Sequence, residues 1–355
     1  MLPRTLLVLL IFLTTVVSVA AGSVDLDESS PRRLAVSPDG QSIAVASGDR
    51  VVRVWDAATG KLLHTLELDQ PGTAVAFAPD GGVLLAGTSG TRSVATEPTR
   101  GHLYAWTLTA GEVKLRWRAP IVGQVMGLAV EPRGQWCAAI TVYARLGIYS
   151  LENGSLRRNW SELGNSPSDV AVSPDGKTIV TAGQAFILWD TTQEKRADEI
   201  VDAEKPLDAQ KSQRFIRAQK AGSIATAIAA EGKWAVAVGY FVNAQGRPID
   251  VVQLDMTSAQ IMRIIAKGIH GTTCIALSPD DTTVALGLNS GMIKVFNIRD
   301  QKQIAEWQLD NMENIRSIAY LAGGKQLAIA SHHGHKVILI DATTGKTVKQ
   351  LWPEK

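Results

Sequence analysis

The sequence predicts an all-β protein, a seven-bladed β-propeller of four-stranded antiparallel blades preceded by an N-terminal signal segment. Three features support this prediction: an apolar sequence motif that recurs seven times, a second recurring motif that ends in a polar residue, and turn motifs between the predicted strands. The 355 residues suggest two or three domains by length alone. Because the units recur about every 47 residues, we expect one closed ring instead.

The first motif is an apolar triplet with a central alanine, followed by Ser-Pro-Asp-Gly or a variant of it. The central residues are Ala35, Ala76, Ala129, Ala171, Ala227, Ala276 and Ala319. We expect each triplet to form a short inner strand, strand A, where a crowded axis favours a small side chain. Proline presets φ and glycine accepts positive φ, so the following motif predicts a hairpin turn into strand B.

The second motif is a large apolar residue followed by a polar residue, and we expect it to lie at the end of the third strand of each blade, strand C. The pairs are Trp55-Asp56, Trp106-Thr107, Tyr149-Ser150, Trp189-Asp190, Leu254-Asp255, Phe296-Asn297 and Ile340-Asp341. Turns such as Thr-Gly-Lys then lead into strand D. Since Trp55, Trp106 and Trp189 recur at one position of the unit, we expect them to fill space between blades rather than to form a sugar-binding platform.

The chain resembles the WD40 repeat family over roughly residues 32–352. The Ser-Pro-Asp-Gly turn and the Trp-Asp pair carry the resemblance, with Trp55-Asp56 and Trp189-Asp190 as literal matches. The resemblance implies a scaffold that binds proteins, and a ring closed by strands shared between the first and last repeats. Both terminal units here carry all four strands, so we expect blade 7 to pack on blade 1, with residues 24–26 adding a short strand.

Residues 1–21 have the pattern of a secretory signal peptide, residues 22–31 that of a linker, and residues 32–355 form the repeats. Arg4 is the only charged residue before Asp25, and the run LLVLLIFLTTVV precedes small residues suited to a signal peptidase. The sequence therefore predicts a secreted or periplasmic protein. The alternative is an uncleaved helix that tethers the protein to a membrane, because the uncharged stretch at 5–24 approaches spanning length.

The composition excludes several classes of protein. A formal net charge of +2, with 45% hydrophobic and 20% charged residues, argues against a disordered tail and against nucleic acid as a partner. We expect Cys137 and Cys274 to be buried and unpaired, since they fall on nearly opposite blades. The sequence holds no HExxH motif, nucleophile elbow or phosphate-binding glycine loop, so we expect no cofactor and no enzymatic activity.

Three insertions lengthen the units, at about residues 89–100, 203–220 and 240–248. In an up-and-down blade the A–B and C–D turns lie at one end, here named the turn end. The B–C loops and D–A linkers lie at the other, the loop end. The first and third insertions are predicted B–C loops and the second a D–A linker, so all three open on the loop end. This clustering predicts a protein-binding face, although long exposed loops are tolerated anywhere.

The candidate partner-binding residues all belong to this face. They are Arg92, Arg100, His102, Arg214, Phe215, Arg217, Tyr240, Phe241, His332, His333 and His335. The linker at 203–220 carries five positive residues against two acidic ones, with apolar residues between the cations. This pattern suits a partner with an acidic surface, and a solvated linker or short surface helix is the alternative.

Two other functions stay open at this point. Three histidines in the B–C loop of blade 7, His332, His333 and His335, have the density of a zinc or copper site. No carboxylate or cysteine accompanies them in the sequence, so a polar loop is the simpler interpretation. An enzyme could use the channel where the strand A ends converge, but the residues there make a poor catalytic set: Arg33, Met126, Asp169, Thr273 and Arg316.

Overall fold

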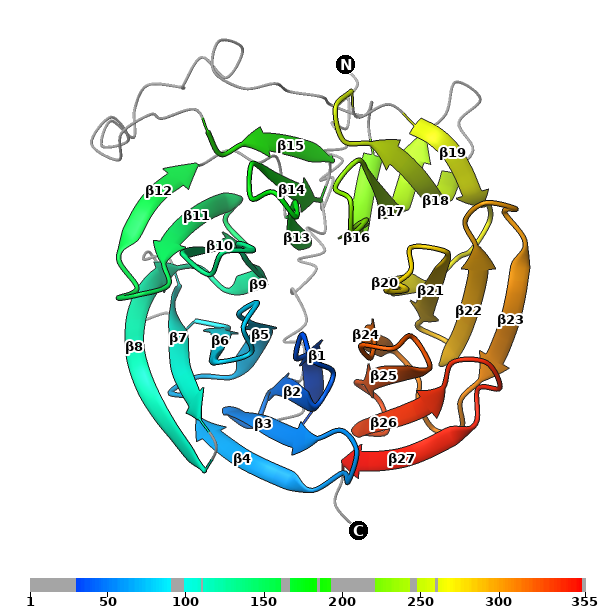
Figure 1. Cartoon of the computed structure of the whole chain (residues 1–355). Coiled ribbons are helices and arrows are strands. Elements are labelled where there is room, and N and C mark those ends of the chain that lie inside the picture. The colour runs from blue at the N-terminus through cyan, green and yellow to red at the C-terminus, as the bar shows by residue number, and fades with distance from the viewer. Residues whose placement is uncertain are drawn as a thin grey trace, which may run out of the picture.

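A computed structural model describes residues 30–90, 99–109, 111–160, 167–183, 186–192, 221–242, 248–258 and 261–352. The strands form seven sheets arranged as a ring around a central axis, as Figure 1 shows. The predicted propeller is thereby confirmed. In each blade the first strand lies nearest the axis and the last lies on the rim.

The first half of the ring contains blades 1 to 4. Blade 1 comprises β1 (Pro31–Val36), β2 (Ser42–Ser47), β3 (Val51–Asp56) and β4 (Leu62–Glu67). Blade 2 comprises β5 (Gly72–Phe77), β6 (Val83–Thr88), β7 (Arg100–Thr109) and β8 (Glu112–Val122). Blade 3 comprises β9 (Val125–Val130), β10 (Trp136–Thr141), β11 (Arg145–Ser150) and β12 (Leu156–Trp160). Blade 4 comprises β13 (Asp169–Val172), β14 (Thr178–Ala182) and β15 (Ile187–Asp190).

The second half contains blades 5 to 7. Blade 5 comprises β16 (Ala221–Ile228), β17 (Trp234–Val242), β18 (Pro248–Asp255) and β19 (Ile261–Ala266). Blade 6 comprises β20 (Thr272–Leu277), β21 (Thr283–Leu288), β22 (Met292–Asn297) and β23 (Gln303–Gln308). Blade 7 comprises β24 (Ile315–Tyr320), β25 (Gln326–Ser331), β26 (Lys336–Asp341) and β27 (Thr347–Trp352). Strands within each blade pair in chain order, and a fourth strand of blade 4 would fall at 193–220, outside the described residues.

The Ser-Pro-Asp-Gly motifs form the predicted A–B turns. In blade 1 the Ser37 hydroxyl donates to Asp39 Oδ1 at 2.5 Å and the Gln41 amide donates to the same oxygen at 2.9 Å. Gly40 takes a φ of +73°. These hydrogen bonds hold the pKa of the Asp39 carboxyl below its usual range. The corresponding turns of blades 4 and 6 use Asp175 and Asp280 in the same way.

The hydrophobic core is divided into seven clusters, one at each junction between neighbouring blades. Trp55 packs in the junction of blades 7 and 1, Trp106 in that of blades 1 and 2, and Trp189 in that of blades 3 and 4. The predicted role of these tryptophans as fillers between blades is confirmed. Four of the strand A alanines pack in these junctions, where the blades converge towards the axis and leave room for a small side chain: Ala35, Ala129, Ala276 and Ala319.

The ring closes by side-chain packing between blades 7 and 1, as expected from the complete terminal units. No strand is exchanged between these two blades in the part of the chain that the structure describes. The Leu34 amide donates to Ser317 Oγ at 3.2 Å, and the Arg53 guanidinium lies 4.4 Å from the ring centroid of Trp352. The predicted extra strand at 24–26 lies outside the described residues.

Both cysteines are unpaired and buried, which confirms the prediction for them. Burial raises the pKa of the Cys137 thiol to about 12 and that of Cys274 to about 11. Thiols with such values stay protonated and unreactive at neutral pH. Their place is structural, in the junctions of blades 2 and 3 and of blades 6 and 7.

Candidate functional site at the loop end of the channel

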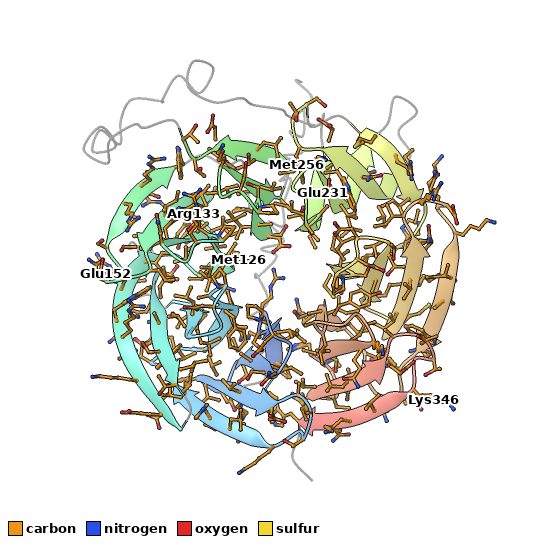
Figure 2. The ribbon with its side chains drawn as sticks, in the orientation of Figure 1. Met126, Arg133, Glu152, Glu231, Met256 and Lys346 are labelled. Carbon is orange, nitrogen blue, oxygen red and sulfur yellow. The ribbon has the colours of Figure 1, made fainter. Side chains whose placement is uncertain are left out.

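A cavity of about 590 Å³ lies where the strand A ends converge at the loop end. Six of its lining residues occupy one position of the repeat, two residues before the first residue of each apolar triplet. They are Arg32, Thr73, Met126, Ser168, Thr273 and Arg316. Figure 2 shows Met126 on the inner side of its blade, beside the central axis. Six of the seven blades thus contribute one equivalent residue each to a common site.

Hydrogen bonds between neighbouring blades fix the rim of this cavity. Thr73 Oγ1 of blade 2 donates to the Val125 carbonyl of blade 3 at 2.7 Å. Thr273 of blade 6 donates to the Ile315 carbonyl of blade 7. These hydroxyls are already committed to backbone oxygens, so they shape the cavity and are poorly placed to act as nucleophiles.

Arg33 crosses the channel from blade 1 to blades 3 and 4. Its Nη2 donates to the Ser168 carbonyl at 3.0 Å and lies 3.6 Å from Asp169 Oδ1. The other carboxylate oxygen of Asp169 accepts the Thr226 amide of blade 5 at 3.0 Å. Burial raises the pKa of Asp169, and the positive charge of Arg33 opposes that shift. The ion pair therefore compensates the negative charge of Asp169 and links blade 1 to blade 4 across the axis of the ring.

Arg32 and Arg316 are the remaining charged residues of the cavity lining, and the imidazole of His332 lies beside them. Arg32 Nη2 is shielded from solvent and has no hydrogen-bond partner among the described residues. Burial and the charge of Arg316 lower the pKa of Arg32, and burial and Arg33 lower that of Arg316. Burial, then Arg316, lower the pKa of His332. Arginine keeps its charge through shifts of this kind, so the cavity is electropositive.

The three histidines of blade 7 are the residues of the predicted metal site. His332 lines the cavity, and its ring centroid lies 4.9 Å from that of His333, while His335 has a φ of +50°. Within the described ranges, no three His, Cys, Asp or Glu side chains form a group that could hold a metal ion. The geometry gives no support to the metal-binding alternative.

Two candidates lie on the outer part of blade 2. Arg100 is exposed at the start of β7. His102 Nδ1 lies 3.0 Å from Asp69 Oδ2, and the Tyr104 hydroxyl donates to Asp69 Oδ1 at 2.6 Å. Arg118 also pairs with Asp69. Burial lowers the pKa of His102 against the opposing charge of Asp69. This imidazole belongs to a network that ties strands C and D to the preceding linker.

Two of the predicted insertions are partly strand, which corrects their expected boundaries. Tyr240 and Phe241, expected in a B–C loop, lie in β17 and pair with Gly222 and Ala221. Arg100 lies in β7 and pairs with Val122. The added residues extend the hairpins because continued pairing satisfies their backbone groups. The other candidates lie outside the described residues, namely Arg92, Arg214, Phe215 and Arg217.

Sequence reasoning placed Arg33, Met126, Asp169, Thr273 and Arg316 near the channel, and the structure confirms that they converge. It missed Arg32, Thr73, Gln124, Val125 and Ser168, and His332 is the one residue of this lining that was among the candidate binding residues. The available signal was the repeat register, since the second position before each triplet is the position that lines the cavity.

Comparison with known proteins identifies the repeats. The family described as "WD domain, G-beta repeat" matches residues 27–56, and "Anaphase-promoting complex subunit 4 WD40 domain" matches residues 275–355. Seven blades of the repeating unit lie between and around these matches. The chain is a WD40-repeat β-propeller. The two matches cover residues near the two ends of the chain, and the repeats between them vary more widely from one another in length.

Relatives of this WD40 propeller share parts of its length. A "WD repeat-containing protein WDS homolog" of Arabidopsis thaliana is 31% identical over 44% of this chain and 29% of its own length. An uncharacterized WD repeat-containing protein of Synechocystis sp. is 44% identical over 16% of this chain and 17% of its own. The "U5 small nuclear ribonucleoprotein 40 kDa protein" of Bos taurus is 38% identical over 21% of this chain and 22% of its own length. The matches thus cover less than a third of each relative.

Proposed function

We propose that this WD40 propeller is an exported, non-catalytic scaffold that binds a protein partner through its loop end. The observation that carries the proposal is the polar cavity at that end, to which six blades each supply one equivalent residue. The predicted insertions open on the same end. A WD40 fold is typical of interaction scaffolds, and fold alone does not determine function, so the site has to carry the argument.

The names of similar proteins point in the same direction. One relative is named as a protein of a ribonucleoprotein, and one matching family is named for a subunit of a complex. Both names describe components of assemblies. A component that holds others in place needs a rigid, multi-sided surface more than a catalytic group, and a closed ring of blades supplies one.

The chemistry of the channel favours binding over catalysis. Guanidinium, hydroxyl, amide and imidazole groups line the cavity, and the neighbouring Asp169 carboxylate is paired with Arg33. Acid–base catalysis needs a proton acceptor that reaches its substrate, and the Asp169 oxygens are committed to Arg33 and to the Thr226 amide. These groups are suited to holding a charged ligand in place.

Partner binding is tested with charge reversals at the two ends of the ring. The loop-end variant is Arg214→Glu/Arg217→Glu, and the turn-end control is Lys61→Glu/Lys346→Glu, whose lysines are exposed in C–D turns. Each variant is cross-linked in envelope extract of the host and its partner is quantified by mass spectrometry. We expect the loop-end variant to lose most of the partner, roughly tenfold for two lost ion pairs, and the control to retain it. Equal retention by both variants would show that the loop-end linker does not bind the partner.

Export is tested by removing residues 2–21. We expect the full chain to leave the cytoplasm and to begin near residue 22 in its mature form, since small residues precede that point. The truncated chain should remain in the cytoplasm. Cell fractionation and the mass of the intact protein measure both outcomes. A full-length mass in the membrane pellet would favour the tethered form, and an uncleaved cytoplasmic protein would contradict export. Among the described residues, no helix is long and apolar enough to span a bilayer.

A further inference from the structure

The cavity at the loop end carries more positive than negative charge. Arg32 and Arg316 line it, and Arg33 enters it from blade 1. Asp169 compensates Arg33. Neither Arg32 nor Arg316 forms an ion pair with any carboxylate among the residues that the structure describes. Two guanidinium charges are therefore left over in a space of about 590 Å³.

Arg32 also has an unused donor. Its Nη2 atom is shielded from water and finds no acceptor in the described part of the chain. A buried donor on a charged group without an acceptor is costly, and the cost is removed when an oxygen reaches it. The planar fork of a guanidinium matches two oxygens of one carboxylate or phosphate group. The unpaired Nη2 atom of Arg32 thus indicates a ligand with negative charge and with two oxygens in one plane.

We propose that this cavity binds a multiply charged oxyanion, a phosphate or polycarboxylate group, held between Arg32 and Arg316. Two uncompensated cations call for at least two negative charges, because a single charge would leave the cavity electropositive. The site accepts a free anion or an acidic group carried by a partner, since the guanidinium groups recognise the same oxygens in both. It stands independently of the loop-end linker on which the scaffold test relies.

His332 makes the binding pH-dependent. Burial lowers the pKa of His332, and the positive charges of Arg316, His333, Arg32 and His335 lower it further. A bound anion offsets the neighbouring positive charges and so raises the pKa of His332. Protonated His332 then attracts the anion, and affinity should rise as the pH falls through the pKa of this imidazole. Proton uptake on binding is the corresponding calorimetric signature.

The first experiment titrates pyrophosphate and citrate into the full chain by isothermal titration calorimetry at low salt. We expect binding that weakens as salt is added. Arg32→Gln and Arg316→Gln should each weaken it roughly tenfold, the usual effect of losing a charge-assisted hydrogen bond. Arg133→Gln is the matched control, because Arg133 is exposed in the A–B turn of blade 3 at the turn end (Figure 2). It should bind like the wild type.

A second variant changes the affinity in the opposite direction. Asp169→Asn removes the carboxylate that competes for Arg33, while the amide oxygen can still accept the Thr226 amide. We expect the anion to bind several-fold more tightly. A damaged fold weakens binding, so tighter binding by Asp169→Asn together with weaker binding by Arg32→Gln separates the site from a general effect on stability.

The same series of titrations controls for competition between the added anion and acidic residues of the chain itself. Asp25, Asp27 and Glu28 stand four to seven positions before Arg32 in the sequence. All titrations are therefore repeated in the Asp25→Asn/Asp27→Asn/Glu28→Gln background, and a hexaglutamate peptide is compared with the free anions. Tighter binding of the peptide assigns the oxyanion to a partner, and tighter binding of pyrophosphate or citrate assigns a free ligand. No binding of any probe in either background, or equal losses in Arg133→Gln and Arg32→Gln, overturns the proposal.

Discussion

Trp55→Ala is expected to lower the free energy of unfolding by about 3–5 kcal/mol, the usual cost of truncating a fully buried tryptophan. The Trp55 side chain is 0% exposed and packs against Leu339 and Leu351 of blade 7. Its removal leaves a cavity at the junction that closes the ring. Denaturation in urea, followed by the far-UV circular dichroism of the β-sheets, measures the change.

Two further tryptophan variants serve as controls. Trp307 lies on the outer strand β23 and is partly exposed, so Trp307→Ala should cost less than half as much. The indole nitrogen of Trp55 has no hydrogen-bond partner among the described residues. Trp55→Phe thus removes an unpaired polar atom along with one ring, and should cost less than Trp55→Ala by more than half. Equal losses in all three variants would contradict a special role for the closing junction.

Gly40→Ala is expected to cost about 3 kcal/mol, from two causes that act together. The φ of +73° is a left-handed conformation that costs an L-residue about 1–2 kcal/mol. A Cβ atom there would also lie 2.8 Å from Ala322 Cβ and 2.9 Å from the Ala322 amide nitrogen. Ala322 belongs to the A–B turn of blade 7, so the clash pushes the last blade away from the first.

Gly81→Ala separates the two causes. Gly81 has a φ of +71°, nearly that of Gly40, but its added Cβ would meet no atom closer than 3.9 Å. It should therefore cost only the backbone strain of about 1–2 kcal/mol. The difference between the two unfolding free energies measures the contact across the closing junction. A difference near zero would mean that blade 7 yields to the extra methyl group without cost.

Most of the fold could be predicted because each junction between blades presents the same physical demand. A small residue near the axis, such as Ala35, and a large one further out, such as Trp55, recur for that reason and set the register. The number of blades and the closure by packing follow from this register. The extent of each hairpin does not. Tyr240 and Phe241 carry no turn signal that separates an extended strand from a loop, and only pairing with Gly222 and Ala221 makes them strand.

The candidate site was less predictable, since its chemistry depends on contacts between distant parts of the chain. The register places Arg33 and Asp169 at equivalent positions of their blades, but their ion pair spans the channel between blades 1 and 4. Only the closed ring shows that this pair compensates Asp169 while Arg32 and Arg316 are left without a carboxylate among the described residues. The contact between His102 of blade 2 and Asp69 of the preceding linker illustrates the same limit.

The closing junction also has a consequence for the order in which the protein is made. Synthesis proceeds from the N-terminus, so blade 1 is complete long before blade 7 exists. The face of blade 1 that bears Ile43, Val45 and Trp55 is fully buried in the finished ring. Its partner residues, such as Leu339, are synthesised almost 300 positions later. Until then the last blade cannot bury this apolar face. The nascent chain therefore exposes an aggregation-prone surface, which becomes buried when blade 7 is synthesised and packs against it.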